Sequence, residues 1–529
     1  MLELIPMKRL SEVVFILILL IFSWWLMFHT FAYDPGRQQI LISTKAWSDF
    51  GALLPLIRFF SFGFSWPLQH PLFSGEPIRY HFLFYALVGG LEKIGLPIHL
   101  ALNIPSLIGF FALLLLIYYS GRVFFGQRLV GFLAVIFFLF NSSFSFLDFF
   151  RRYHFSDLFS LSHFVSFRPW NDSLITAFWN LNIYTNQRHL AFSFALVLFL
   201  VIILYQRRLK LIYFTGFILG VLVLTNQAAF LIACLFVFSF FIFQPSLRLV
   251  LFLSFFGIIP WVLFYRLTNT FPALPVYEPG YLAAHPLSIT GFIKFWWMNL
   301  GLSLITIPLG LLFSPRRVRL FVIPLLIIFI APSLFRFSAD MVNNHKFFNF
   351  FVLFGNLYTS WVLVKIWSFK PPYRLVVIPL FALLIAGGIV DIFPVKNDYF
   401  IRLPDIKSNP DAQFFLRTPP GSVVLNSTWF YHPASLAGRP IYNGYSYFTW
   451  SYGYNQVARE NSAISIYASP DLTTACRQLQ AARISYVELS KSAEGFIHPN
   501  YELWDSLPAV YTNPSTNLKI YSVNDICPK

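Results

Sequence analysis

A short stretch of the chain, residues 48–85, holds a dense set of ionisable side chains, although only 11% of all residues are charged. These side chains are Asp49, Arg58, His70, Glu76, Arg79 and His81. A carboxylate can take a proton from an acceptor, and nearby cations can neutralise a departing phosphate. The stretch therefore indicates a transfer reaction on a phosphate-linked substrate. Asp49 and Glu76 are the candidate catalytic carboxylates. Arg79 and His81 are candidate substrate-binding residues.

The same stretch also has a purely structural interpretation. Residues 49–62 carry apolar side chains at helical spacing, which predicts a helix lying along the membrane surface. Asp49, just before the apolar run, would then be an ordinary helix N-cap. The functional interpretation is favoured because the charged residues converge: Glu76 and Arg79 lie at the end of the loop, just before the next apolar segment.

The rest of the chain is apolar enough to build a membrane scaffold for these residues. Of its 529 residues, 57% are hydrophobic, against about 45–50% in soluble domains. Apolar runs near the length of a membrane span recur up to residue 394, which predicts a polytopic α-helical membrane protein. The expected spans are 12–32, 80–96, 101–120, 129–147, 189–206, 211–226, 228–244, 248–267, 291–313, 320–335, 346–367 and 374–394.

The distribution of basic residues predicts the orientation of the chain. The formal net charge is +16, and basic residues concentrate in short loops such as 207–210 and 316–319. Because basic loops face the cytoplasm, we expect a cytoplasmic N-terminus. Loop 33–79 and the tail from residue 395 then lie outside the cytoplasmic (plasma) membrane. Nucleic-acid binding is not indicated, since no basic run with interleaved aromatic residues occurs.

The expected spans contain one conflict. Three of them, 80–96, 101–120 and 129–147, lie between loop 33–79 and loop 147–188, which are both predicted to be outside, so an even number of crossings is required. Either one of the three is not a full crossing, or a further span lies near 147–180. We expect an odd total of 11 or 13 transmembrane helices, and the sequence leaves the choice open.

The tail has a different composition and predicts a second domain. Charged and turn-forming residues appear after residue 395, with strand-like runs and an amphipathic helix over 471–484. We therefore expect a transmembrane domain, 1–394, and an extracytoplasmic α/β domain, 395–529. Cys476 and Cys527 would form a disulfide if the tail is outside, which stays open. The aromatic segment 427–454 is expected to pack on the membrane domain rather than bind sugar.

Two further polar clusters lie at the outer ends of predicted spans. Gln187 and Arg188 belong to the first, and Arg336, His345 and Lys346 belong to the second. A guanidinium binds phosphate with paired donors, so these residues are candidate ligands for a lipid phosphate. The structural alternative for the first cluster is an anchor at the membrane interface, and that for the second cluster is a solvated loop.

The order of these features resembles the integral-membrane GT-C glycosyltransferases, and is similar to that of the protein O-mannosyltransferases and the aminoarabinose and arabinofuranose transferases. Asp49, in WSDFG, matches the acid of the first outer loop in these enzymes. Glu76 and Pro77, with Arg79, match the second acid and its basic neighbour. The early acid is a lone Asp rather than an acidic pair, so a divalent metal held by Asp49 is left open.

The resemblance implies a function as well as a fold. It implies 11–13 transmembrane helices with a C-terminal extracytoplasmic α/β domain. It also implies transfer of a sugar from a polyprenyl-phosphate donor to an acceptor glycan, lipid or protein at the outer face. The alternatives are a transporter or export component and a catalytically dead GT-C relative. Few charges lie inside the apolar runs and the two halves show no similarity, which disfavours transport.

Overall fold

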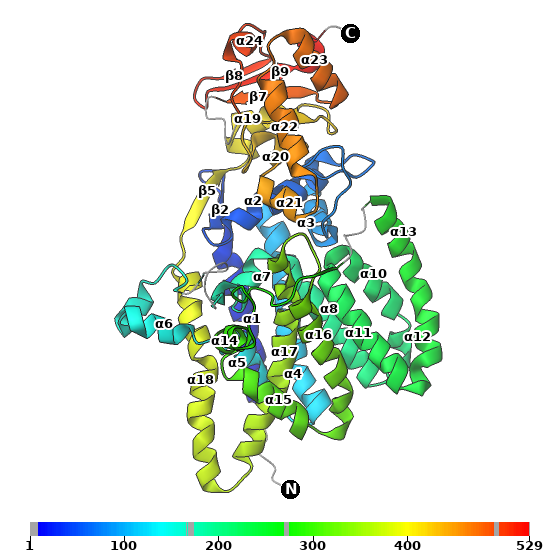
Figure 1. Ribbon diagram of the computed structural model, residues 1–529, viewed down its shortest axis with the longest axis vertical. Helices are drawn as coiled ribbons and strands as arrows, with labels where there is room; N and C mark the ends of the chain where they lie inside the picture. Colours follow the sequence, from blue (N-terminus) through cyan, green and yellow to red (C-terminus); the bar gives the residue numbers. More distant parts are fainter. Residues whose placement is uncertain (1–8, 166, 168–173, 269–274, 491–496, 528–529) are drawn as a thin grey trace.

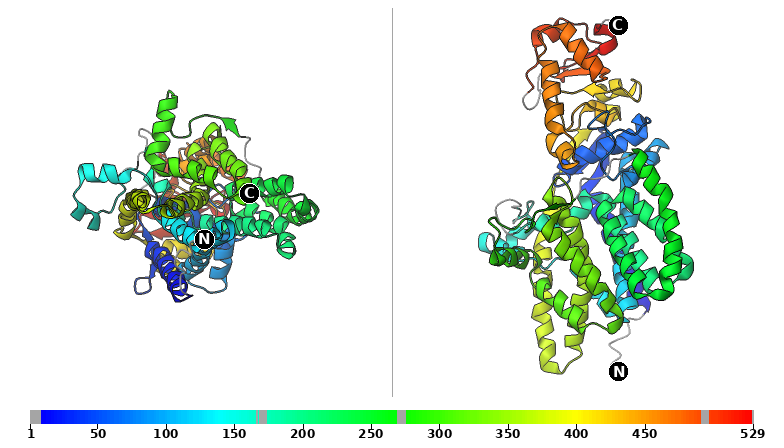
Figure 2. Two further views of the ribbon diagram at one scale, coloured as in Figure 1. Left: turned by 90° about the horizontal axis from the view of Figure 1, so that it is seen from below. Right: turned by 45° about the vertical axis from the view of Figure 1, so that its right-hand side comes forward.

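The computed structural model describes residues 9–527 apart from 166, 168–173, 269–274 and 491–496. A bundle of helices carries a smaller region of helices and strands at one end (Figure 1). That smaller part, residues 400–527, is called the C-terminal region, and the end of the bundle beneath it is called the capped end. The N-terminus lies at the opposite end of the bundle (Figure 2).

Long apolar helices build the bundle. Seven helical segments among the described residues are long and apolar enough to cross a membrane, so the chain is a multi-pass α-helical membrane protein. They include α1 (Arg9–Thr30), α4 (Ile98–Phe125), α8 (Arg188–Tyr205), α17 (His345–Trp367) and α18 (Pro371–Lys396). The other two are 245–268, which contains α12 (Arg248–Ser254) and α13 (Ile259–Thr268), and 316–334, which contains α16 (Val322–Leu334).

The number of long helices is lower than the expected 11 to 13. The pair α14 (Ile289–Leu300) and α15 (Ser303–Phe313) makes an eighth segment, bent by 88°. The remaining candidates among the described residues are the shorter apolar helices α5 (Arg128–Leu139), α10 (Thr215–Thr225) and α11 (Gln227–Phe243).

The expected span 80–96 is not a full crossing. Its helix, α3 (Leu83–Lys93), has 11 residues and so a length of about 16 Å, against about 30 Å of hydrocarbon. It packs on α2 (Trp47–Arg58) and the π-helical turn η1 (Phe59–Gly63). Gly89 makes this approach close, because a Cβ there would lie 2.6 Å from the Ile57 carbonyl oxygen. The span 80–96 is therefore a partial crossing, which was one of the two alternatives that the sequence left open.

The predicted surface helix is present as α2, but it does not lie on a lipid surface. All residues from Phe50 to Arg58 are buried, and α2 packs against α3 and α20 (Pro433–Leu436) of the C-terminal region. Arg58 is fully buried between Glu92, at 2.9 Å, and Asp405, at 2.5 Å. A buried charge requires such partners. The pairing ties α2 to α3 and to the start of the C-terminal region.

A small sheet joins the first loop to the beginning of the C-terminal region. The strands β1 (Phe31–Asp34), β2 (Gln39–Ser43) and β5 (Phe400–Pro404) pair in the order β1-β2-β5. Both pairings are antiparallel, and Ile42 of β2 lies opposite Ile401 of β5. This sheet fixes the position of α2, which follows β2 directly.

The C-terminal region has the predicted α/β character. Its sheet has the order β6-β7-β9-β8, from β6 (Val424–Leu425), β7 (Tyr486–Ser490), β8 (Tyr511–Asn513) and β9 (Leu518–Ser522). The predicted amphipathic helix is α23 (Leu472–Ala481), and Asp471 caps it by accepting a hydrogen bond from the Thr474 amide. A disulfide joins Cys476 of α23 to Cys527.

Candidate functional site

Asp49 lies in the first turn of α2, at the capped end of the bundle. The N-cap of α2 is Ala46, without a side-chain hydrogen bond, so the interpretation of Asp49 as an N-cap is wrong. Its carboxylate is partly buried and is hydrogen-bonded by the Asn186 side chain. Burial raises the pKa of Asp49 to about 6, although Asn186 and Lys346 both favour the charged form. This carboxylate can therefore gain or lose a proton near neutral pH.

Lys346 is the charged partner of this carboxylate. It is the second residue of α17 and is only 7% exposed. Its Nζ donates to Asn343 Oδ1 at 3.2 Å, and its charge interacts with those of Asp49 and Asp340. An ionisable group at a membrane helix end that faces the protein interior is a candidate functional residue. The structure thus brings together two residues that the sequence assigned to the same site.

Two histidines stand next to Lys346 with unused hydrogen-bonding atoms. The rings of His81 and His189 lie 4.3 Å apart, and His189 Nδ1 is 2.7 Å from the Tyr85 hydroxyl. The Nε2 atoms of both are buried and have no hydrogen-bond partner among the described residues. Burial, His189 and Lys346 hold the pKa of His81 well below its usual range. These two atoms indicate a polar ligand, since an unpaired buried group is costly.

His345 and Gln187 meet on the other side of Lys346. The Asn349 side-chain nitrogen lies 3.0 Å from His345 Nδ1. His345 Nε2 lies 3.4 Å from the Gln187 side-chain nitrogen, and the ring stacks on Phe178 with centroids 5.1 Å apart. The two residues therefore support the first turn of α17 and the start of α8.

Tyrosines from two parts of the chain surround Asp49. Those whose hydroxyls interact electrostatically with its carboxylate are Tyr80, Tyr85, Tyr431, Tyr447 and Tyr452. Tyr447 donates to Asp340 Oδ2 at 2.6 Å, and Tyr431 donates to the Trp47 carbonyl oxygen. The aromatic segment 427–454 thus packs on the bundle, as expected, and also faces the site. The sequence favoured packing over a role of this segment in the site, and His189 was not among the candidate substrate-binding residues.

Glu76 and Arg79 pair with each other and with the C-terminal region. Their side chains are 3.3 Å apart, and Glu76 is 40% exposed. Arg79 donates to the Gly453 carbonyl oxygen, and its guanidinium lies over the Tyr454 ring at 4.7 Å. These contacts hold the aromatic segment over the site. A direct role in chemistry for Glu76 or Arg79 stays a prediction.

Arg188 and Arg336 also have protein partners. Arg188 is 1% exposed and donates to the carbonyl oxygens of Thr185 and Met27, at 2.7 and 3.1 Å, and to Thr30 Oγ1 at 2.8 Å. Arg336 Nε lies 3.1 Å from Glu278 Oε2. To bind at either guanidinium, a phosphate would have to displace these protein partners. Among the described residues Lys346 donates one hydrogen bond, to Asn343, and a phosphate would have to displace that bond alone.

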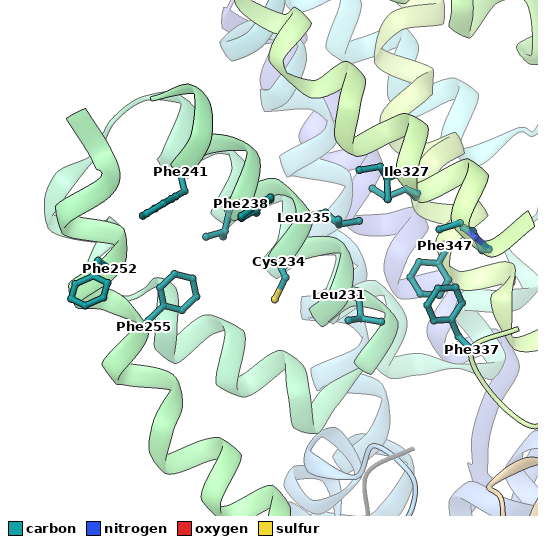
Figure 3. Close-up of a pocket in the computed structure, with 14 residues that line it drawn as sticks. Leu231, Cys234, Leu235, Phe238, Phe241, Phe252, Phe255, Ile327, Phe337 and Phe347 are labelled. Atoms are coloured by element: carbon teal, nitrogen blue, oxygen red, sulfur yellow. The ribbon is translucent and has the colours of Figure 1, made fainter. Parts of the chain in front are cut away.

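An apolar groove of about 590 Å³ opens between α11, α12 and α16. Figure 3 shows Phe337 and Phe347 at one end of it and Phe252 and Phe255 at the other. Phe347, which lines one end of the groove, directly follows Lys346 in α17. The groove was not predicted from the sequence, because its walls come from helices whose apolar faces look like ordinary packing surfaces.

The surroundings of Asp49 do not suit a divalent metal. The polar groups that stabilise its charge are the Asn186 amide and the Lys346 ammonium, and an ammonium repels a cation. Across the described part of the chain, no three or more His, Cys, Asp and Glu side chains form a group that could hold a metal ion. No step of the chemistry is therefore assigned to a metal.

Comparisons with solved structures identify the fold. ArnT from Cupriavidus metallidurans bound to undecaprenyl phosphate has a TM-score of 0.52 and 12% identity, with 99% of this chain and 100% of that chain covered. Arabinofuranosyltransferase AftD from mycobacteria has a TM-score of 0.51 and 13% identity, covering 96% and 40%. The apo Archaeoglobus fulgidus oligosaccharyltransferase has a TM-score of 0.50 and 12% identity, covering 91% and 70%.

The chain therefore has the fold of the GT-C membrane glycosyltransferases, as its sequence order predicted. Identities of 12–13% show a shared fold only. No protein-family model matches the sequence, and no curated protein matches it.

Proposed function

We propose that this protein transfers a sugar from a polyprenyl-phosphate donor to an acceptor glycan, lipid or protein. One observation carries the proposal: Asp49, whose pKa is raised to about 6, faces Lys346, and Lys346 precedes a residue at the end of an apolar groove. The groove suits an isoprenoid chain in the membrane, and the ammonium suits its phosphate. The likeness in fold to ArnT bound to undecaprenyl phosphate supports this arrangement.

The proposed reaction needs one base and one cation. Asp49, in its ionised form, takes the proton of the acceptor hydroxyl as the acceptor oxygen attacks C1 of the sugar. The bond between C1 and the phosphate oxygen breaks, and both of its electrons leave with the lipid phosphate. Lys346 neutralises the charge that develops on that phosphate. The products are the glycosylated acceptor, the lipid phosphate and a protonated Asp49.

The remaining predicted residues have supporting roles in this proposal. His81, with His189, faces the polar head of the donor, and His345 and Gln187 hold Lys346 in place. Arg188 anchors the start of α8 on α1. In this proposal Glu76, Arg79 and Arg336 act through the segments that they join, and a direct role of Glu76 or Arg79 in the chemistry stays a prediction from the sequence.

The proposal also includes the placement of the chain. The N-terminus is cytoplasmic, and the capped end, with Asp49, lies outside the plasma membrane. The division of the chain is a transmembrane domain over 1–394 and an extracytoplasmic domain over 395–529. The disulfide between Cys476 and Cys527 supports this orientation, because disulfides persist in oxidising compartments.

Mass spectrometry of lipids that co-purify with the protein in mild detergent tests the proposal. We expect a polyprenyl phosphate, or its glycosylated form, with the unmodified protein. Lys346→Met should lose it, and Ala331→Trp, which fills the groove, should lose it as well. Lys365→Met is the matched control, because this lysine lies over the Trp361 ring near the other end of α17. Only bulk phospholipid in all samples would contradict the proposed donor.

A further inference from the structure

A segment beside the bundle exposes large apolar side chains. It contains α6 (Ser145–Arg152) and the short helix η2 (Phe155–Phe159), and it is called the side segment here. Figure 1 and the left view of Figure 2 show it projecting from the bundle next to α18. Phe150, Phe155 and Phe159 are 55%, 64% and 61% exposed. Exposed apolar patches mark surfaces that have a partner.

The other face of the side segment is packed on a membrane helix. Phe149 and Leu158 are buried in a cluster with Val390 of α18. Asn397, just after α18, donates to the carbonyl oxygens of Leu158 and Leu161, both at 3.0 Å. The height of the side segment along the bundle is thus fixed by the last turns of α18.

That height corresponds to the edge of the hydrocarbon. Helix α18 has 26 residues and so is about 39 Å long, against about 30 Å of hydrocarbon. Lys370 and Lys396 stand at its two ends. Val390, in the penultimate turns, therefore lies where the helix leaves the lipid tails, and the side segment lies at the same level.

The exposed arginines of the side segment suit this position, and both also pair with Asp148 of α6, at 3.5 and 3.9 Å. Arg151 is 76% exposed, and Arg152 is 40% exposed. Phenylalanine side chains fit the acyl boundary, and arginines reach lipid headgroups. We infer that the side segment is an in-plane membrane anchor, with its phenylalanines among the lipid tails and its arginines at the headgroups.

The anchor is linked to the proposed reaction site through Lys45. The Lys45 ammonium donates to the Ser162 carbonyl oxygen at 2.6 Å and pairs with Asp398 at 3.0 Å. Asn186, which bonds Asp49, also donates to the Lys45 carbonyl oxygen at 3.0 Å. Lys45 therefore connects the residues just after the side segment to the surroundings of Asp49.

Spin labels on the full-length protein in lipid nanodiscs test the anchor. Labels are placed at Phe155→Cys and Phe159→Cys in a Cys234→Ala background, because Cys234 is the free cysteine among the described residues. Ile378→Cys, 60% exposed on α18, is the hydrocarbon reference. Val457→Cys, 65% exposed on α22 (Gln456–Tyr467), is the water reference.

Collision rates with molecular oxygen and with a water-soluble nickel chelate then give the depth of each label. We expect the labels at 155 and 159 to collide more often with oxygen than with the chelate, at a depth between the two references. Collision rates equal to those at Val457 would overturn the anchor and indicate a segment free in water. Low rates with both reagents would also overturn it and indicate a surface covered by protein. Neither outcome depends on the identity of the donor.

Discussion

The carboxylate of Asp49 and the ammonium of Lys346 interact although they come from α2 and α17, at distant positions in the chain. Burial opposes both charges, and each charge stabilises the other. A phosphate that enters beside Lys346 would compete with Asp49 for the ammonium. The carboxylate would then hold a proton more readily, which is what a base at the acceptor requires.

Substitution Asp49→Asn should abolish sugar transfer and leave lipid binding intact. The amide keeps the shape of the side chain but cannot accept the proton, and loss of a general base lowers kcat about 10²–10⁴-fold. The measurement is transfer of labelled sugar to the acceptor, alongside lipid analysis of the purified variant. Asp505→Asn, at a surface pair with Lys519, is the control and should keep full activity. Normal transfer by the Asp49 variant would remove Asp49 from the chemistry.

The same substitution should stabilise the folded protein. Since the pKa of Asp49 is raised to about 6, its charged form destabilises the fold, and that cost appears as pH rises from about 4 through 6. The side chain of Asp49 is partly exposed, so this loss of folding free energy amounts to about 1–2 kcal/mol. Thermal unfolding in detergent at pH 7 should show a higher midpoint for Asp49→Asn. At pH 4 the two midpoints should be equal, and a lower midpoint at pH 7 would contradict the raised pKa.

The pH profile of transfer should follow the ionisation of Asp49. Because the ionised carboxylate is the base, kcat/KM should fall about tenfold per pH unit below about 6 and level off above it. Lys346→Met removes a charge that favours ionisation, so the midpoint of its residual activity should move to higher pH. An unchanged midpoint in that variant would mean that the two residues do not interact during the reaction.

His189→Phe should weaken binding of the phosphate-bearing donor. The substitution keeps the ring volume but removes the unpaired Nε2 and the bond from Tyr85. One hydrogen bond to a charged group corresponds to about 1.5–3 kcal/mol, so KM should rise about 10- to 100-fold. His99→Phe is the control, because this ring stacks on Tyr33 with centroids 5.5 Å apart. Equal loss of affinity for a polyprenol without phosphate would point to a packing defect instead.

Removal of the disulfide should destabilise the C-terminal region and report on its compartment. The bond closes a sequence separation of 51, and its loss typically costs about 2–4 kcal/mol. Cys476→Ser and Cys527→Ser should lower the unfolding temperature by similar amounts.

The same disulfide reports on the compartment of the C-terminal region. In intact cells, thiol alkylation before lysis should leave both cysteines of the wild-type protein unalkylated. Modification of both would place the C-terminal region in a reducing compartment and contradict the proposed orientation.

The sequence by itself determined the class of the protein and part of its site. Hydropathy is a local sum, so the apolar runs of α4, α17 and α18 identify a multi-pass membrane protein. Cap and turn residues are also local, which is why α23 was predicted at its correct place. Asp49 and Lys346 could be named because rare charges next to apolar runs stand out in such a composition.

Only the tertiary structure decided how these residues are used. Arg188 has the side chain expected of a phosphate ligand, but its hydrogen bonds are accepted by Met27 and Thr30, which are far away in the chain. Helix α3 packs on α2 instead of crossing the membrane, and the groove is formed by helices that meet only in the fold. Hydrogen-bond capacity and cavity shape depend on contacts between distant segments, and no local pattern in the sequence records them.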